Sequence, residues 1–163
     1  MPSTTTKHAG KSRRFDCLEQ EAYLSLWRTY DRLRALEDEM FGRHGLTAQQ
    51  YNALRLLRGV KSEGMQTLTL AGRLISRAPD ITRLLDRLEE QGLVARERLS
   101  GNRRVVLIRI TASGLALLSR LDAEVRESHE RQLGHLDRTE LRSLIGLLRA
   151  ARRPHEPVKS DWI

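Results

Sequence analysis

Five arginines and one acidic residue, Glu97, lie between residues 93 and 110, so this segment carries a net charge of +4. The arginines are Arg96, Arg98, Arg103, Arg104 and Arg109. Guanidinium groups suit the minor groove of DNA, which is negative in potential and can admit them. The cluster therefore predicts contact with a nucleic acid, although a solvated cationic surface would carry the same charge.

A β-hairpin is expected to position these arginines. Residues 94–98 and 104–110 carry β-branched side chains, and they flank the polar turn Ser100-Gly101-Asn102. Two such runs separated by a short glycine-containing loop are typical of paired strands. The hairpin would carry its arginines toward a narrow tip.

A helix is expected directly before the hairpin. Its buried face would consist of Ile81, Leu84, Leu85 and Leu88, which recur at helical spacing. Pro79 fits the first turn, because proline lacks an amide hydrogen that this turn leaves unpaired, and Gly92 fits the C-terminal stop. We expect this helix to enter the major groove of DNA.

Several ordered motifs in this region resemble the MarR family of bacterial winged-helix regulators. ITRLLDRLEEQGLV, then NRRVVLIRIT and a helix start at Thr111 to Gly114, looks like that family's recognition helix and wing. GLTAQQYNALRLL, residues 45–57, looks like its second helix. The resemblance covers about residues 15–150. It implies a mainly α fold with a small β-wing: a winged helix-turn-helix with N- and C-terminal dimerisation helices.

The same resemblance implies a sequence-specific transcriptional regulator, usually a repressor, that binds double-stranded DNA as a homodimer. Two-fold symmetry would place two recognition helices about one DNA turn, roughly 34 Å, apart, as a pseudo-palindromic operator requires. Two alternatives stay open at this point. One is an architectural DNA binder that responds to no ligand, and the other is a winged-helix module that binds an acidic protein.

The family's wing arginine, in a D-x-R tip, corresponds to Arg104, and Asn102 stands where the family has the aspartate. Asparagine can hydrogen-bond an arginine but cannot pair its charge, so we expect a less rigidly oriented wing. Arg98 and Arg103 would hold the minor groove and the DNA backbone around Arg104.

Base contacts are expected from the start of the recognition helix, where the family more often has small hydroxyl residues. The expected residues are Ala78, Pro79, Asp80, Thr82 and Arg83, with Thr82 and Arg83 foremost. Asp80 can accept a hydrogen bond from cytosine N4 and so exclude other bases. Residues 78–91 contain two arginines and four acids, a net charge of −2, so this helix is expected to supply selectivity rather than attraction.

An effector site is also implied by the resemblance. In the family, effectors commonly bind between the dimerisation helices and the DNA-binding lobe. The bulky side chains expected near that junction are Trp27, Tyr30, Tyr51 and Met65. The same side chains fit an ordinary hydrophobic core. A small-molecule effector, aromatic in character, would lower DNA affinity by preferring a dimer with differently spaced recognition helices.

Helices are expected on both sides of the DNA-binding lobe. Residues 15–43 have apolar side chains at helical spacing and predict one long helix. Thr47 with Gln50, and Asp137 with Glu140, form capping boxes, and Thr111 is a plausible N-cap. The helix after Thr111 is predicted to bury Leu115, Leu118, Leu121, Val125 and Leu133. These helices carry more apolar surface than the lobe needs, so a second copy of the chain is the expected partner.

The predicted organisation has four parts. Residues 1–14 form a disordered basic arm, which could touch phosphate or remain a solvated tail. Residues 15–45 and 112–151 form a helical dimerisation region, residues 46–111 the winged-helix DNA-binding lobe, and residues 152–163 a C-terminal tail.

Catalytic and metal chemistry are not expected. Cys17 is the single cysteine, which excludes an intrachain disulfide and C-x-x-C motifs. It does not match the peroxide-sensing cysteine of one branch of the family, whose position corresponds to Tyr23. The five histidines are scattered without metal-ligand spacing, and no nucleophile motif or phosphate-binding loop is present. We therefore expect no enzyme activity, cofactor or metal.

The composition agrees with a DNA-binding protein. The chain has 163 residues, of which 39% are hydrophobic and 31% charged, as in one compact domain with tails. A net charge of +8 and a pI near 10.5 favour a polyanionic partner. No run of 18 apolar residues and no secretory signal is evident, so we expect a cytoplasmic protein without a membrane partner.

Overall fold

A computed structural model of the chain describes residues 15–60, 63–76, 80–99 and 102–157, with the side chains of residue 99 and residues 102–104 excepted. The chain divides into two compact units, Met1–Ala35 and Leu36–Ile163. The four-part organisation predicted from the sequence remains a prediction.

The first unit contains the N-terminal part of helix α1 (Leu18–Gly42), which confirms the predicted long first helix. Large apolar side chains along this part are exposed, and they include Leu18, Tyr23, Leu26, Trp27 and Tyr30. The rings of Tyr23 and Trp27 are tilted by 58° with centroids 6.2 Å apart. This helix therefore presents an aromatic surface.

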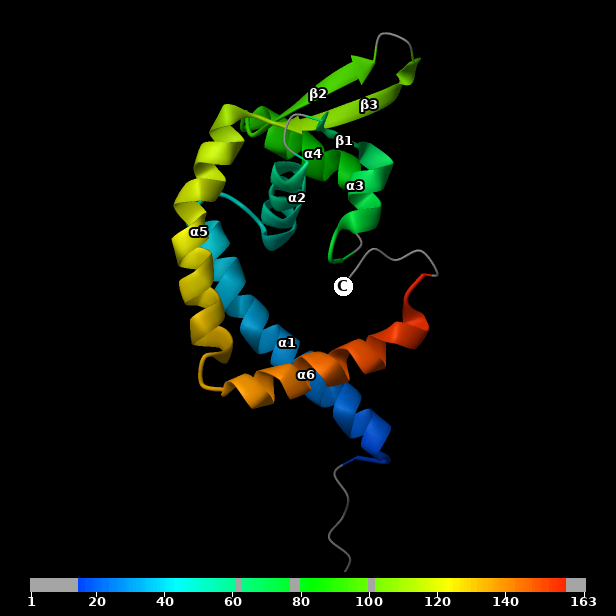
Figure 1. Cartoon of the computed structure of the whole chain (residues 1–163), viewed down its shortest axis with the longest axis vertical. Helices are drawn as coiled ribbons and strands as arrows, with labels where there is room; N and C mark the ends of the chain where they lie inside the picture. Colours follow the sequence, from blue (N-terminus) through cyan, green and yellow to red (C-terminus); the bar gives the residue numbers. More distant parts are fainter. Residues whose placement is uncertain (1–14, 61–62, 77–79, 100–101, 158–163) are drawn as a thin grey trace, which may run out of the picture. The chain divides into compact units, whose positions relative to one another are not determined.

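The second unit is mainly helical with a small sheet, as predicted (Figure 1). Among the described residues, the end of α1 leads into five further α-helices: α2 (Ala48–Gly59), α3 (Thr67–Arg73), α4 (Ile81–Glu90), α5 (Ala112–Leu133) and α6 (Arg138–Arg152). A short 3-10 helix, η2 (Arg153–His155), follows α6. The apolar stripe of α6 includes the half-buried Leu141, Leu144 and Leu148, and no residue of this helix is fully buried.

In the part of the chain that the structure describes, the sheet has three antiparallel strands in the order β1-β3-β2. The predicted hairpin is confirmed as β2 (Val94–Leu99) and β3 (Asn102–Ile110), in which Val94 pairs with Ile110 and Arg96 with Ile108. The sequence patterns did not predict β1 (Met65–Gln66), which lies on the other side of β3.

Side-chain caps fix the starts of three helices where the sequence placed them. Gln50 N donates to Thr47 Oγ1 at 3.2 Å and Thr47 N donates to Gln50 Oε1 at 2.8 Å, which completes the predicted capping box. Asp137 and Glu140 form the second box, and Thr111 Oγ1 accepts from Gly114 N at 3.1 Å. These bonds satisfy amides that the first turn of a helix leaves unpaired.

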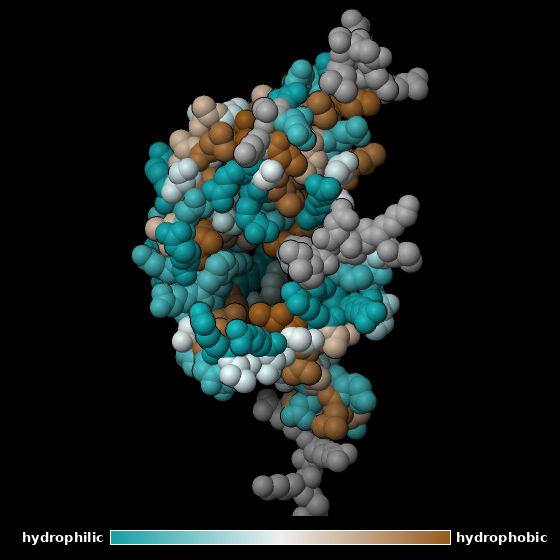
Figure 2. All heavy atoms as spheres, in the orientation of Figure 1, coloured by the Kyte–Doolittle hydropathy of each residue, from teal (hydrophilic) through white to brown (hydrophobic). Residues whose placement is uncertain are grey.

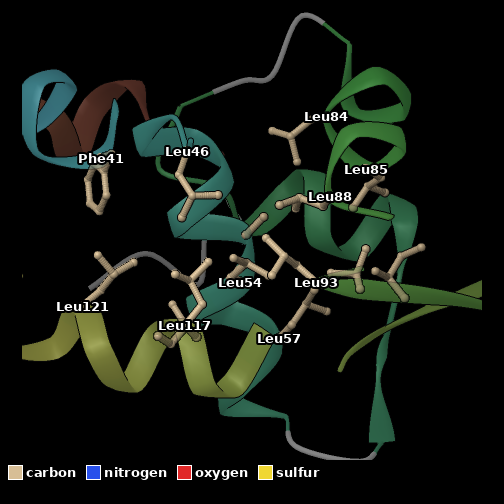
Figure 3. Packing of buried hydrophobic residues seen from close by; sticks show 14 of the residues in the cluster. Phe41, Leu46, Leu54, Leu57, Leu84, Leu85, Leu88, Leu93, Leu117 and Leu121 are labelled. Atoms are coloured by element: carbon tan, nitrogen blue, oxygen red, sulfur yellow. The ribbon is translucent and has the colours of Figure 1, made fainter. Parts of the chain in front are cut away.

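The core lies where α2, α4, α5 and the sheet meet (Figure 3). Its fully buried members include Leu54, Leu57, Leu85, Leu88, Ile108, Leu118 and Leu121. Leu115 was predicted inside but is 41% exposed, whereas Leu117 is buried. The reason is the direction of the buried stripe of α5, which runs through positions 114, 117, 118, 121 and 125 and leaves position 115 at its edge.

Candidate nucleic-acid interface

Helix α4 buries one face and exposes the other, as predicted for the recognition helix. Leu84, Leu85 and Leu88 are buried, and Figure 3 shows them on the side of α4 that faces the core. Thr82 and Arg83, the two residues expected foremost at the bases, are exposed. The geometry thus leaves their side chains free to reach a ligand outside the fold.

The helix begins later than predicted. It starts at Ile81, and the Asp80 carboxylate caps it by accepting from Arg83 N at 2.9 Å, so the expectation of a first turn at Pro79 was wrong. The physical reason is that aspartate is among the strongest N-cap residues. The prediction had placed Asp80 inside the helix and not at its N-cap. Ala78 and Pro79 lie outside the described residues.

The end of α4 leads into the hairpin through a tight turn. Gly92 has a φ of +69°, a conformation that favours glycine, and its N–H donates to Glu89 O at 2.8 Å. Leu93 N then donates to Leu88 O at 2.9 Å. This turn confirms the predicted stop at Gly92 and sets the hairpin directly beside α4.

The hairpin, here called the wing (residues 94–110), places the predicted arginines in different positions. Arg98 is exposed on β2, next to an irregularity in strand pairing between Arg98 and Leu99. The backbones of Arg103 and Arg104 belong to β3, while their side chains and residues 100–101 lie outside the described part of the chain. The contact of the Arg104 guanidinium with DNA therefore stays a prediction.

Two wing arginines are paired with acids, so the attraction of the wing is smaller than its formal charge indicates. Arg96 lies 2.6 Å from both Asp86 and Glu89, and Arg109 Nε lies 2.6 Å from Glu97 Oε2. Desolvation disfavours the charge on Arg96, but hydrogen bonds to Asp86 and Glu89 outweigh it and raise the Arg96 pKa. The net charge of +4 predicted to attract a nucleic acid included both of these arginines.

Arg83 and Arg87 line a surface hollow of about 320 Å³ between α4 and the start of α2. The other lining residues are Thr47, Gln49, Gln50, Asp80 and Leu84. Arginines four residues apart lie on one face of a helix, so the side chains of Arg83 and Arg87 extend from the same face of α4. A polyanion lying across this face would meet both charges together.

The four side chains predicted for an effector site belong to both units. Trp27 and Tyr30, in the first unit, are 60% and 56% exposed. In the second unit Met65 is buried, and Tyr51 stacks on Phe41 with ring centroids 4.6 Å apart. Burial raises the pKa of the Tyr51 phenol, and this effect is larger than the lowering of the pKa by the positive charges of Arg55 and Arg58. Met65 thus behaves as a core residue, and the shared pocket stays a prediction.

A second hollow, of about 580 Å³, has a charged lining: Arg43, Glu124, Glu127, Glu130 and Arg131, with Gly134.

Across the residues that the structure describes, no group of three or more histidine, cysteine, aspartate or glutamate side chains could hold a metal ion. No helix within the same described ranges is long and apolar enough to cross a membrane.

The chain is similar to transcriptional regulators of known type. A family model described as the MarR family matches residues 46–106. The homoprotocatechuate degradative operon repressor of Escherichia coli is 31% identical over 106 residues, which cover 65% of this chain and 70% of that protein.

Solved structures give the same result. A MarR transcription factor from Planctomyces limnophilus is 58% identical, with a TM-score of 0.67, over 84% of this chain and 99% of that one. A MarR family transcriptional regulator from Streptomyces coelicolor, solved in complex with DNA, is 21% identical and shares the fold, with a TM-score of 0.78 over 91% and 94% of the two chains.

Proposed function

Because this chain belongs to the MarR family, we propose that it is a repressor that binds a pseudo-palindromic operator as a homodimer. The observation that carries the proposal is the exposed face of α4, with Thr82 and Arg83, beside a wing that exposes Arg98. An α-helix fits the major groove, and a two-stranded tip with arginines fits the adjacent minor groove. The names of its relatives as regulators, one of them a repressor, support the same reading.

Within this proposal, the residues divide by task. Arg83 and Thr82 read base edges, and Asp80 holds the start of α4 through one carboxylate oxygen while the other accepts from a base. Arg98, Arg103 and Arg104 hold the minor groove and the phosphates. Ala78 and Pro79 complete the base-reading segment.

The homodimer is proposed from apolar surface that the single chain leaves uncovered. Ile145 and Leu147 of α6 are 47% and 70% exposed, and Trp27 and Tyr30 of α1 are exposed as well. Figure 2 shows hydrophilic residues over most of one face of the molecule, interrupted by separate apolar patches. Exposed apolar side chains on helices at both ends of the chain are typical of an interface between subunits.

A small aromatic effector is part of the same proposal, with Trp27, Tyr30, Tyr51 and Met65 as its candidate contacts. Such a ligand can shift the DNA-binding equilibrium only by its difference in affinity between the two states of the dimer. A regulator of this kind works on the chromosome, so we place it in the cytoplasm of a bacterial cell.

The test is a footprint of the purified protein on the DNA upstream of its own gene, together with its mass in solution. We expect protection of an inverted repeat and the mass of a dimer. Protection without sequence preference would favour an architectural DNA binder. Absence of any salt-dependent DNA binding would favour a module that binds an acidic protein.

A further inference from the structure

Arg96 connects the wing to the recognition helix at a place where no base or phosphate contact is expected. We propose that Arg96 is a positioning residue: it braces the wing against α4 so that both enter their grooves as one rigid reader. This inference rests on the proposed DNA-binding function.

The brace consists of four bonds from one residue. Arg96 Nη2 lies 2.6 Å from Asp86 Oδ1 and donates to Thr82 O at 3.3 Å. Arg96 Nη1 donates to Glu89 Oε2 at 2.6 Å, and the Arg96 backbone N–H donates to Glu89 Oε1 at 3.2 Å. Both the side chain and the backbone of this strand residue are therefore tied to α4.

The partners of Arg96 follow one stripe of α4. Positions 82, 86 and 89 have the spacing i, i+4 and i+7, so they lie above one another along the helix. The planar guanidinium group bridges this stripe with donors held in a fixed fork. A single ion pair could rotate about its contact, whereas a fork attached at three points along a helix resists both rotation and sliding.

Because of the position of Arg96 in the sheet, a small change of angle at this residue displaces the far end of β2 by a larger distance. Arg96 pairs with Ile108 of β3, and Ile108 is fully buried in the core. The pairing with β3 therefore also holds the base of the wing in place. Beyond it, β2 continues to Leu99. At about 3.3 Å per residue, Leu99 lies roughly 10 Å further on, and a tilt of about 10° at Arg96 would move it by about 2 Å. A displacement of this size would break a hydrogen bond made by the end of the strand.

The Arg109–Glu97 pair provides a matched control within the same hairpin. Its N–O distance is also 2.6 Å, and Arg109 is 34% exposed against 26% for Arg96. This pair joins β2 to β3 and does not involve α4. Removing Arg109 therefore removes the same charge from the wing without removing the brace.

The experiment compares Arg96→Ala, Arg109→Ala and the double variant Asp86→Asn/Glu89→Gln in full-length protein. Protection of guanine N7 against methylation reports the major groove, and hydroxyl-radical protection reports the minor groove. We expect Arg96→Ala to keep the major-groove protection at saturating protein, to lose the minor-groove protection, and to weaken operator binding by about tenfold. Arg109→Ala should keep both protections and change affinity by less than about fivefold.

The double variant separates a brace from a simple charge effect and remains informative if Arg96→Ala does not fold. Asparagine and glutamine keep the shapes of Asp86 and Glu89 but remove two negative charges from the DNA-reading helix. Charge alone predicts tighter DNA binding, whereas the brace predicts weaker binding and loss of minor-groove protection.

Three results would overturn the brace: intact minor-groove protection in Arg96→Ala, an equal loss in Arg109→Ala, or tighter operator binding by the double variant. If the unmodified protein protects neither groove of any fragment, the proposed function itself is wrong, and the brace is wrong with it.

Discussion

The backbone of Gly114 packs against the backbone carbonyl of Leu93 without room for a side chain, at the point where the wing leads into helix α5. A β-carbon at position 114 would overlap Leu93 O and would stand 2.7 Å from Ile110 Cγ1. The carbonyl of Leu93 is held there because it accepts from Thr111 N at 3.0 Å. Leu93, which directly precedes β2, and the first turn of α5 are thus packed backbone against backbone.

Gly114→Ala is expected to destabilise the fold by about 1–3 kcal/mol, because the backbone at Leu93 and the half-buried side chain of Ile110 must move to accept the methyl group. Urea denaturation followed by circular dichroism measures this. Gly72→Ala in α3 is the control: nothing lies within 4 Å of its β-carbon, so it should be neutral or stabilising by up to about 1 kcal/mol. Equal stability of the two variants would mean that the contact relaxes freely.

Arg83→Ala is expected to weaken binding to the operator more than binding to random DNA, because a base contact contributes only at the correct sequence. The loss on the operator should be about 1–3 kcal/mol. Fluorescence anisotropy with both DNAs at one salt concentration gives the two affinities. Equal losses on both would make Arg83 a phosphate contact.

Arg104→Ala is expected to reduce operator affinity by about 1–3 kcal/mol and to lower the salt slope by about one, because a cation in the minor groove releases a counterion on binding. The measurement is affinity across a series of salt concentrations. Binding that is unchanged at every salt concentration would remove Arg104 from the interface.

Tyr51 predicts a loss of stability in alkaline solution. Its pKa is raised by burial, so the unfolded chain loses the phenol proton at a lower pH than the folded chain. The stabilising contribution is complete below the ordinary value of about 10 and disappears as the pH rises through the folded value. The urea midpoint should therefore decrease more between pH 8 and a pH above 10 in the unmodified protein than in Tyr51→Phe. Tyr23→Phe, at an exposed position of α1, should behave like the unmodified protein.

Local signals in the sequence predicted much of the fold. The caps at Thr47, Thr111 and Asp137 were predictable because a cap depends on side chains within three residues. The apolar spacing of α4 was predictable because one face of that helix is fully buried. The wing followed from its β-branched residues and polar turn.

Features that depend on distant parts of the chain were not predictable in this way. Strand β1 has two residues and no periodicity, and it exists because β3 offers it a partner. The ion pairs of Arg96 were not predicted, because spacing along a strand does not show that Asp86 and Glu89 approach it from a helix. The buried stripe of α5 was misplaced at Leu115 for the same reason, since the sequence of a helix does not show which side of it meets the rest of the core.

The pairing of β1 with β3 has a consequence for how the DNA-binding lobe folds. Met65 pairs with Ile108 and Gln66 with Leu107, so these few bonds close a loop that contains α3, α4 and most of the wing. Closing so long a loop costs entropy before any contact repays it, and such distant pairings slow folding. During synthesis the recognition helix leaves the ribosome before the strand that secures it, so we expect it to remain unfixed until β3 has emerged.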